Sequence, residues 1–219
     1  MTVTAIPAAG CAGPLSVIDP AGPHAASVAQ LWWVMLGGSV LLALLVFGLL
    51  FAAFRRRGTG EGNGDGQGSQ RLWLGWLGLA MPCAVLAALL GYALVVGGRT
   101  LPTPAADAVT IGVEARRYAW AFTYPNGVET DGVLHIPAGR PVDVYITATD
   151  VIHSFWVPRL AGKMDAIPGH TNVLRIVASR PGTYRGECAE YCGTGHKDHG
   201  FTVVAHDAAG WATFIGGAR

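Results

Sequence analysis

One short stretch near the C-terminus concentrates the residues that are best suited to chemistry. It contains Cys188, Cys192, His196 and His199, and a further histidine, His153, lies at the end of a predicted strand upstream. Thiolate and imidazole groups suit copper or zinc rather than calcium or magnesium. In a fold of two sheets a strand end can lie beside such a loop. These five residues therefore predict a metal site.

Two simpler interpretations of the cysteines remain open on the residues alone. Cys188 and Cys192 could form a disulfide, because exported domains keep such bonds. A bridge across so small a loop would stabilise the fold least, however, and it would leave the nearby histidines unexplained. A closed zinc site is the second interpretation, since zinc accepts the same ligand types.

The composition indicates a membrane protein with a polar half. Hydrophobic residues make up 51% of the 219 and charged residues 13%, against about a quarter charged in ordinary soluble domains. The net charge of +1 provides no basic field for nucleic acid. Residues 31–54 and 72–98 carry no charge, and each run exceeds the roughly 20 apolar residues that span a bilayer. We therefore expect a two-helix transmembrane hairpin over residues 31–98.

Particular residues within the two runs support that expectation. Tryptophans lie at the starts of both runs, where amphipathic rings prefer the membrane surface. Pro82 is expected to kink the second helix, and Cys83 is interpreted as a small apolar core residue. The tryptophans are Trp32, Trp33, Trp73 and Trp76.

Arginines predict the orientation of the hairpin. Arg55, Arg56, Arg57 and Arg71 flank the glycine-rich residues 58–70, and the positive-inside rule makes loop 55–71 cytoplasmic. Residues 1–30 and everything after residue 98 would then be periplasmic. Cys11 follows a small-residue run that is similar to a lipoprotein processing site, so we expect either lipidation with an upstream start or an exposed thiol.

The second half of the chain has the pattern of a β-sandwich. A proline-containing linker, residues 99–107, precedes short alternating runs at 109–113, 142–146, 174–177 and 201–203, which predict strands. Pro-Gly turns separate them, so residues 108–219 predict an antiparallel sandwich or barrel. Residues 208–215 predict a short helix that packs Trp211 and Phe214 on the sheet. His135, His170 and His206 are expected to be surface or hydrogen-bonded histidines.

The motifs resemble a known family. The pattern Cys188-x-Glu190-x-Cys192-x3-His196 resembles the binuclear copper A loop of subunit II of haem-copper cytochrome c oxidases. Residues 150–158, residues 162–169 and the aromatic run 118–124 are similar to other segments of that subunit, and the likeness covers roughly residues 12–215. The resemblance implies a membrane-anchored all-β fold, with the helical hairpin followed by a cupredoxin-like Greek-key β-sandwich or barrel.

The resemblance also implies the ligands of two copper ions. Cys188 and Cys192 would bridge the two ions, His153 and His196 would each bind one, and the backbone carbonyl of Glu190 would complete a weak axial position. The side chain of Glu190 would bind magnesium or manganese at the contact with subunit I, for which a carboxylate is a suitable ligand.

One position departs from the family pattern. Where the family has a methionine ligand, this sequence has His199. An imidazole binds more strongly than a thioether and disfavours Cu(I), so His199 predicts a lower reduction potential and less equivalent metals. Two alternatives remain open: a solvent-facing His199, or a degenerate site that binds copper poorly.

The implied function is electron transfer in a terminal respiratory oxidase of the bacterial inner membrane. Electrons from cytochrome c would arrive near Trp120 and Tyr118, reach copper A and pass to haem in subunit I, where oxygen is reduced to water with proton translocation. The balanced charges and Arg159 predict a tethered or less basic cytochrome donor. Residues 66–71 contain no carboxylate, so no proton-uptake residue is assigned. A membrane-tethered copper carrier and a quinol-oxidase-type subunit without copper are the alternatives.

Overall fold

A computed structural model describes residues 11–56, 70–100, 102 and 107–217. The chain forms two units: residues 30–99 form one, and the residues up to 29 join those from 100 onward in the other. Most of the predicted cytoplasmic loop and of the predicted linker lie outside the described residues, as do the residues that precede Cys11. Cys11 itself is exposed.

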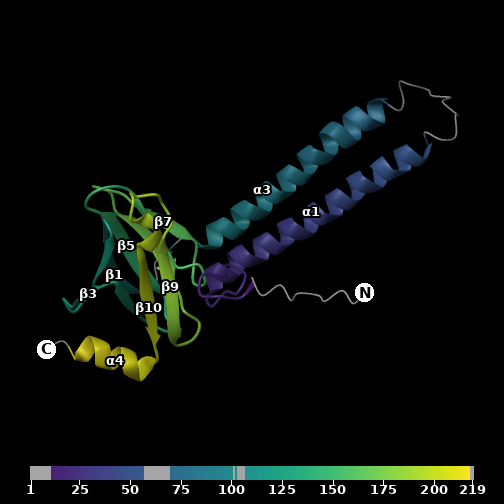
Figure 1. Ribbon diagram of the computed structural model, residues 1–219. Helices are drawn as coiled ribbons and strands as arrows, with labels where there is room; N and C mark the ends of the chain where they lie inside the picture. Colours follow the sequence, from purple (N-terminus) through teal and green to yellow (C-terminus); the bar gives the residue numbers. More distant parts are fainter. Residues whose placement is uncertain (1–10, 57–69, 101, 103–106, 218–219) are drawn as a thin grey trace, which may run out of the picture. The chain divides into compact units, whose positions relative to one another are not determined.

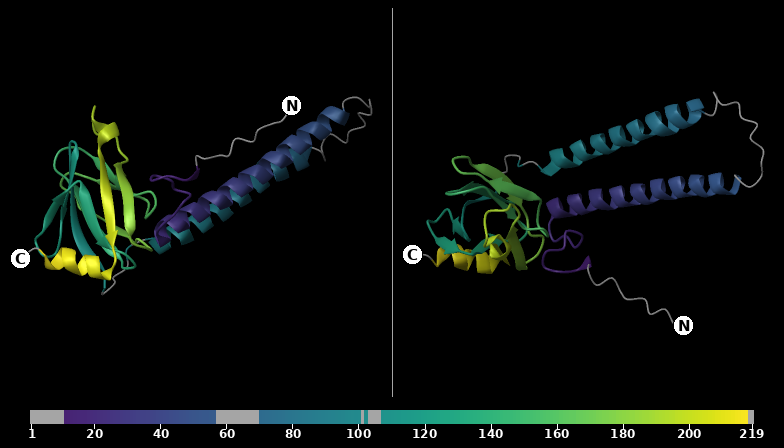
Figure 2. Two further views of the ribbon diagram at one scale, coloured as in Figure 1. Left: turned by 60° about the horizontal axis from the view of Figure 1, so that its bottom comes forward. Right: turned by 45° about the horizontal axis from the view of Figure 1, so that its top comes forward.

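The helical unit consists of two long apolar segments. α1 (Pro23–Arg56) begins before the apolar run, with a proline in its first turn, where a proline costs little. The second segment joins the π-helix η2 (Arg71–Ala80) to α3 (Met81–Thr100), and α1 and α3 run antiparallel (Figures 1 and 2). Both segments are long enough and apolar enough to cross a membrane, and side chains such as Leu41 and Leu94 stay more than 60% exposed.

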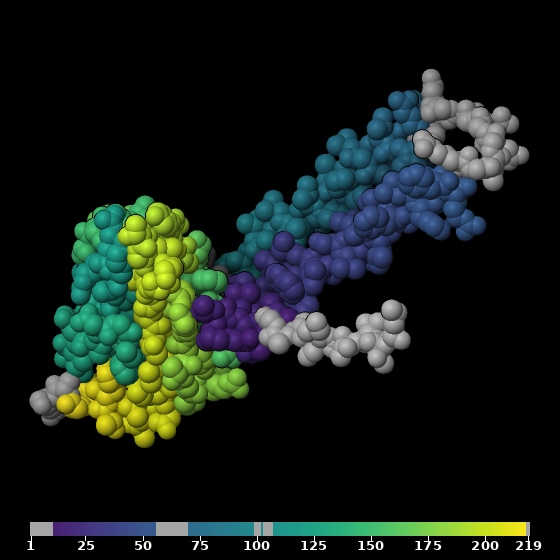
Figure 3. Space-filling view, viewed as in Figure 1, coloured from purple at the N-terminus to yellow at the C-terminus, as the bar shows by residue number. Residues whose placement is uncertain are grey.

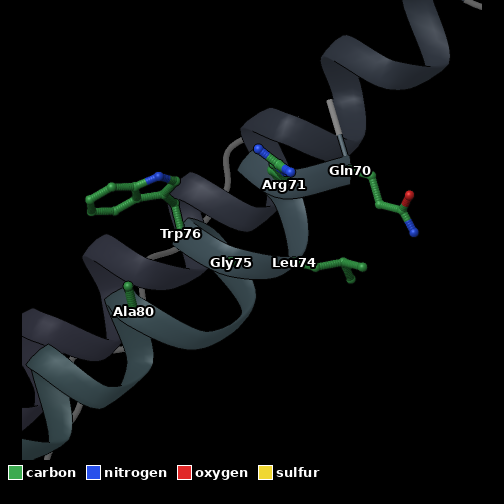
Figure 4. Close-up of a pocket in the computed structure, with 6 residues that line it drawn as sticks. All are labelled: Gln70, Arg71, Leu74, Gly75, Trp76 and Ala80. Atoms are coloured by element: carbon green, nitrogen blue, oxygen red, sulfur yellow. The ribbon is translucent and has the colours of Figure 1, made fainter. Parts of the chain in front are cut away.

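The helix is irregular before Pro82, where η2 has the hydrogen-bond pattern of a π-helix. The kink that was predicted at Pro82 stays a prediction. The amide of Met81 donates to the carbonyl of Trp76, and Pro82 has no amide proton to donate. Around the first turns of η2, residues Gln70, Arg71, Leu74, Gly75, Trp76 and Ala80 line a shallow hollow. Figure 4 shows the indole of Trp76 extending away from the helix, as expected of a residue at a membrane surface.

The other unit is a sandwich of two five-stranded sheets. In chain order the strands are β1 (Val109–Arg116), β2 (Ala119–Thr123), β3 (Glu129–Asp131), β4 (Val133–Pro137), β5 (Val142–Ala148), β6 (His153–Trp156), β7 (Lys163–Ala166), β8 (Asn172–Ile176), β9 (Gly182–Cys188) and β10 (Gly200–His206). One sheet has the order β3-β2-β1-β5-β8 and the other β4-β10-β9-β6-β7. All of the predicted runs fall within or overlap strands.

The pairing within the sheets differs in part from the antiparallel arrangement that was expected. β1 with β5 and β10 with β4 are parallel pairs, while the remaining pairs are antiparallel. Each parallel pair joins strands that are separated in the sequence by other strands, and such a crossover leaves the chain running in the same direction. Alternation along single strands does not reveal this pairing.

The core lies between the sheets and is rich in aromatic rings. Along β1 and β10, alternate residues are buried, as a half-buried strand requires. Trp120, Phe122, Phe155 and Phe201 pack together from both sheets, with ring centroids 4.8–5.8 Å apart where they pair. Gly186 is needed here, because a Cβ at that position would lie 2.2 Å from the ring of Phe201.

The C-terminal helix α4 (Ala208–Gly216) packs on the sandwich as predicted. Asp207 caps it by accepting a hydrogen bond from the amide of Gly210. Phe214 stacks on His135 with a centroid distance of 4.3 Å, and His135 is hydrogen-bonded to His206 at 2.8 Å. In the space-filling view β10 forms a yellow strip along the sandwich, with α4 at one end (Figure 3).

The segment before α1 is tied to the sandwich. The amide of Ala21 donates to the carbonyl of Arg159, and the amide of Ser179 donates to the carbonyl of Ala21. A Cβ on Gly22 would lie 2.2 Å from the carbonyl oxygen of Val177, so only glycine permits this approach. Arg159 forms an ion pair with Asp19 at 2.8 Å. The charge of Arg159, on which the prediction of a less basic cytochrome donor partly rests, is therefore paired within the chain.

Candidate metal centre

Two strands of one sheet and the loop that connects β9 to β10 carry the predicted ligands. His153 begins β6, Cys188 ends β9, and β6 pairs with β9 so that Phe155 lies opposite Cys188. The loop closes through the short helix η3 (His196–Asp198), and the amide of Cys188 donates to the carbonyl of His199 at 3.0 Å. The sheet therefore brings residues that are 35 positions apart into contact.

Four of the predicted ligands form a buried cluster. The ligand atoms of His153, Cys188, Cys192 and His199 all lie within 4.8 Å of one another. The Cys188 sulfur lies 3.9 Å from the Cys192 sulfur and 3.9 Å from His153 Nδ1, and the Cys192 sulfur lies 3.6 Å from His199 Nδ1. This arrangement is one set of candidate donors around a shared pair of sulfurs.

A second set of ligands meets the same two sulfurs. His196 Nδ1 lies 3.7 Å from the Cys192 sulfur, and the backbone carbonyl of Glu190 lies 3.2 Å from the Cys188 sulfur. His196 is not a member of the cluster of four. The Glu190 side chain is exposed. The two cysteines are thus common to two groups of donors, each of which includes a histidine.

Both cysteines are free thiols in this structure, so the disulfide interpretation is not supported. Burial and, as the next largest cause, the neighbouring Cys188 raise the pKa of the Cys192 thiol to about 11. A thiol of this kind stays protonated near neutral pH unless a metal ion replaces the proton. Metal binding at this site would therefore be coupled to proton release.

His199 is buried, and the solvent-facing alternative is wrong. Its side chain is 0% exposed and stacks on Trp120 with a centroid distance of 5.2 Å and an interplanar angle of 24°. Burial lowers the pKa of His199, and an interaction with the backbone of Ala119 opposes that shift. A neutral imidazole with Nδ1 near the Cys192 sulfur is in the state that a metal ligand needs.

Asp150, which was not among the predicted site residues, contacts one of the candidate ligands. Its carboxylate accepts hydrogen bonds from His153 Nε2 at 2.8 Å, from the Val151 amide and from the Arg117 amide. Burial alone would raise the pKa of Asp150, but these hydrogen bonds hold it at about 2. A carboxylate in this position fixes the ring of a ligating histidine. Its place three residues before His153 is the signal that could have found it.

The acid stability of the domain should therefore depend on Asp150. Because the folded-state pKa is depressed from 3.8 to about 2, this group stabilises the fold above pH ~4, and the contribution is lost as the pH falls towards 2. Asp150→Asn should unfold more easily than wild type near neutral pH, with the difference shrinking below pH ~4. Urea unfolding of the copper-free full chain in detergent, followed by tryptophan fluorescence, measures this difference.

Asp198→Asn, at an exposed aspartate beside Lys197, is the control. A constant difference between Asp150→Asn and wild type across that pH range would contradict the assignment.

The two predicted electron-accepting aromatics occupy different depths. Trp120 is fully buried beneath His199, whereas Tyr118 is 42% exposed and its ring centroid lies 6.0 Å from that of His199. Tyr118 packs over the loop, where a Cβ on Gly195 would lie 2.8 Å from its ring. Of the two residues, only Tyr118 can contact a partner protein directly.

The sequence of this domain matches a known family model. Residues 110–206 match the model described as the periplasmic domain of cytochrome c oxidase subunit II. The β-sandwich domain belongs to this family. The crystal structure of the periplasmic domain of subunit II of the Bradyrhizobium japonicum cytochrome oxidase covers 53% of this chain and 96% of its own, with 27% identity and a TM-score of 0.50. The β-sandwich therefore has the cupredoxin-like fold of subunit II domains.

Curated relatives extend the match along the chain. A cytochrome c oxidase subunit 2 of Alkalihalophilus pseudofirmus is 32% identical over 206 residues, which are 90% of this chain and 60% of the relative. A ubiquinol oxidase subunit 2 of Acetobacter aceti is 40% identical over 96 residues, which are 43% of this chain and 31% of the relative. The chain thus spans 60% or less of the length of these two relatives.

The residues of this subunit II domain fit a copper centre. The donors are two sulfurs, imidazole nitrogens and one carbonyl, a soft to borderline set that suits copper. They are buried together, and the far nitrogen of His153 is held by Asp150. Zinc would also accept thiolates and imidazoles, but a closed zinc site uses four ligands. Six donors, of which the two sulfurs are shared by the other four, fit a pair of metal ions better.

Proposed function

We propose that this chain is the electron-transferring subunit II of a haem-copper terminal oxidase, with a binuclear copper A centre. The observation that carries the proposal is the pair of buried thiols shared by two sets of donors. Cys192 lies 3.7 Å from His196 and 3.6 Å from His199, and Cys188 lies 3.9 Å from His153 and 3.2 Å from the Glu190 carbonyl.

The chain's own residues would hold the centre rigid and dry. Copper A, when bound, is a one-electron carrier whose charge is spread over two metals. The hydrogen bond between Asp150 and His153 and the stacking of His199 on Trp120 fix two ligands in their orientations. A ligand shell held by packing and hydrogen bonds changes little between two charge states. The protein thereby favours rapid electron transfer.

Tyr118 would be the point at which electrons arrive from cytochrome c. It is exposed, and its hydroxyl and ring contact Thr194, Gly195 and His199. Hydrogen bonds from the Gly195 backbone and Thr194 lower the pKa of Tyr118. Because Arg159 is paired with Asp19, it does not itself repel a basic donor. The charge balance of the domain still favours a donor that docks without strong electrostatic attraction.

The donor set that consists of His196 and the Glu190 carbonyl would face the catalytic subunit. The exposed carboxylate of Glu190 would bind magnesium or manganese there. Electrons would leave towards haem in subunit I, where oxygen is reduced to water and protons are translocated. The two apolar segments, α1 and η2 with α3, would anchor the subunit in the bacterial inner membrane. The β-sandwich would lie in the periplasm, and loop 55–71 in the cytoplasm.

Metal stoichiometry tests this proposal. The purified full chain, reduced and reconstituted with copper, should hold two copper ions and show the near-infrared band of a mixed-valence pair. One labile Cu(I) would instead indicate a copper carrier. No copper would indicate a quinol-oxidase-type subunit, the class to which the Acetobacter relative belongs by name. Either of these results would overturn the proposal.

A further inference from the structure

Arg117 connects the two sides of the candidate copper site, although nothing in the sequence pattern marks it. Its Nε donates a hydrogen bond to the carbonyl of Cys192 at 2.9 Å. Its backbone amide donates to Asp150 Oδ2 at 2.9 Å, and Asp150 Oδ1 accepts from His153 Nε2 at 2.8 Å. Arg117, which lies between β1 and β2, therefore contacts two parts of the site. One is the loop of residues 189–199, here called the ligand loop, and the other is the carboxylate that orients His153.

The contact places a permanent positive charge beside the ligand loop. A guanidinium stays protonated at all accessible pH values and donates in a fixed planar geometry. Arg117 Nε also lies 3.6 Å from the position that a Cβ on Gly193 would occupy, so the side chain lies along the loop backbone. The adjacent Arg116 differs, because it lies within 4 Å of the carboxylates of Glu114 and Asp131. Its charge is partly neutralised there.

A cation held at this carbonyl favours the more electron-rich state of the site. Reduction adds negative charge to a centre that already contains two thiolates, and a nearby positive charge stabilises that change. His199 acts in the opposite direction, because an imidazole disfavours Cu(I) relative to a thioether. The two residues therefore have opposing effects on the same equilibrium.

We propose that Arg117 is a positioning residue that raises the reduction potential of the centre by anchoring the Cys192 carbonyl and placing a cation there. The inference rests on the proposed copper A function. In this inference Arg117, which is not itself a ligand, helps to set how readily the subunit accepts an electron. In the structure the Nε hydrogen bond is the contact that carries this role.

Potentiometric titration of the copper-loaded full chain tests the inference. Arg117→Ala should lower the midpoint potential by about 59 mV, a tenfold shift for a one-electron couple. Arg117→Lys keeps the charge and should recover at least half of that loss. Arg116→Ala removes a neighbouring guanidinium that is paired with Glu114 and Asp131 instead of the Cys192 carbonyl, and it should leave the potential unchanged. Copper content and the unfolding temperature of each variant show that the site is intact.

The outcomes separate this inference from the proposed function. If wild type holds two coppers but Arg117→Ala keeps the wild-type potential, the role of Arg117 is wrong and the copper A function stands. An equal fall of the midpoint potential in Arg116→Ala would show a general charge effect and would overturn the inference. A potential in Arg117→Lys as low as that of Arg117→Ala would show a packing effect and would overturn it as well. If Arg117→Ala fails to bind copper, Arg117→Lys becomes the deciding variant. A wild-type potential in Arg117→Lys then supports the inference, and a lowered potential rejects it. A wild-type chain without a copper pair overturns both proposals.

Discussion

Replacement of Cys192 by serine is expected to abolish the binding of two copper ions. The Cys192 sulfur lies within 3.9 Å of Cys188 Sγ, His196 Nδ1 and His199 Nδ1, so it contacts a histidine from each of the two donor sets. A serine hydroxyl is a hard donor that does not ionise near neutral pH, and copper selects soft thiolates. We expect the copper content of the full chain to fall from two ions to one or none, with loss of the near-infrared band.

A matched control separates this effect from general damage. Cys83, which was expected to be a core residue, is instead exposed on α3. Cys83→Ser therefore makes the same chemical change outside the candidate site. It should retain two coppers and the full spectrum. Cys192→Ser itself should fold, because serine is close in size to cysteine, and the unfolding temperature of the copper-free chains checks this. Two tightly bound coppers in Cys192→Ser would show that the thiol pair does not hold the metals.

Replacement of His199 by methionine should raise the reduction potential. The imidazole Nδ1 lies 3.6 Å from the Cys192 sulfur in a fully buried position, where it can act as a ligand. A thioether is a weaker and softer ligand and favours Cu(I). We expect the potential to rise by about 59 mV or more, a tenfold shift for a one-electron couple, and the EPR hyperfine pattern to become more symmetrical.

Stability and a second histidine provide the controls for this substitution. His199→Met loses the stacking contact with Trp120, worth about 0.5–1.5 kcal/mol for aromatic pairs, so a modest fall in the unfolding temperature is expected. His170 is exposed and hydrogen-bonded to Asn172, and His170→Met should change neither the potential nor the EPR spectrum. Unchanged values in His199→Met would exclude His199 from the coordination sphere.

The cluster of candidate ligands was predictable because its residue types are rare and their spacing is short. The strands with clear alternation, the turns at Gly127 and Gly139, and the packing of α4 through Phe214 also followed from local patterns. Local chemistry was sufficient in each of these cases, since a turn, a strand face or a short loop is encoded by neighbouring residues.

The supporting contacts were not predictable for a physical reason. The bond between Arg117 and the Cys192 carbonyl joins residues 75 positions apart, and the bond between Arg117 and Asp150 joins residues 33 apart. The first bond depends on how the two sheets pack, since β1 and β9 lie in different sheets. The second depends on the parallel pair of β1 and β5, which leaves no trace in either strand alone. The burial of His199 likewise required the position of Trp120 on another strand.

The depth of the two thiols has a consequence for how the proposed copper centre would be loaded. Cys188 and Cys192 are 6% and 3% exposed in the folded domain. If copper binds there, we expect it to enter through a transient opening of residues 189–199, a local fluctuation that costs less than global unfolding. The rate of copper loading would then depend on how easily this loop opens.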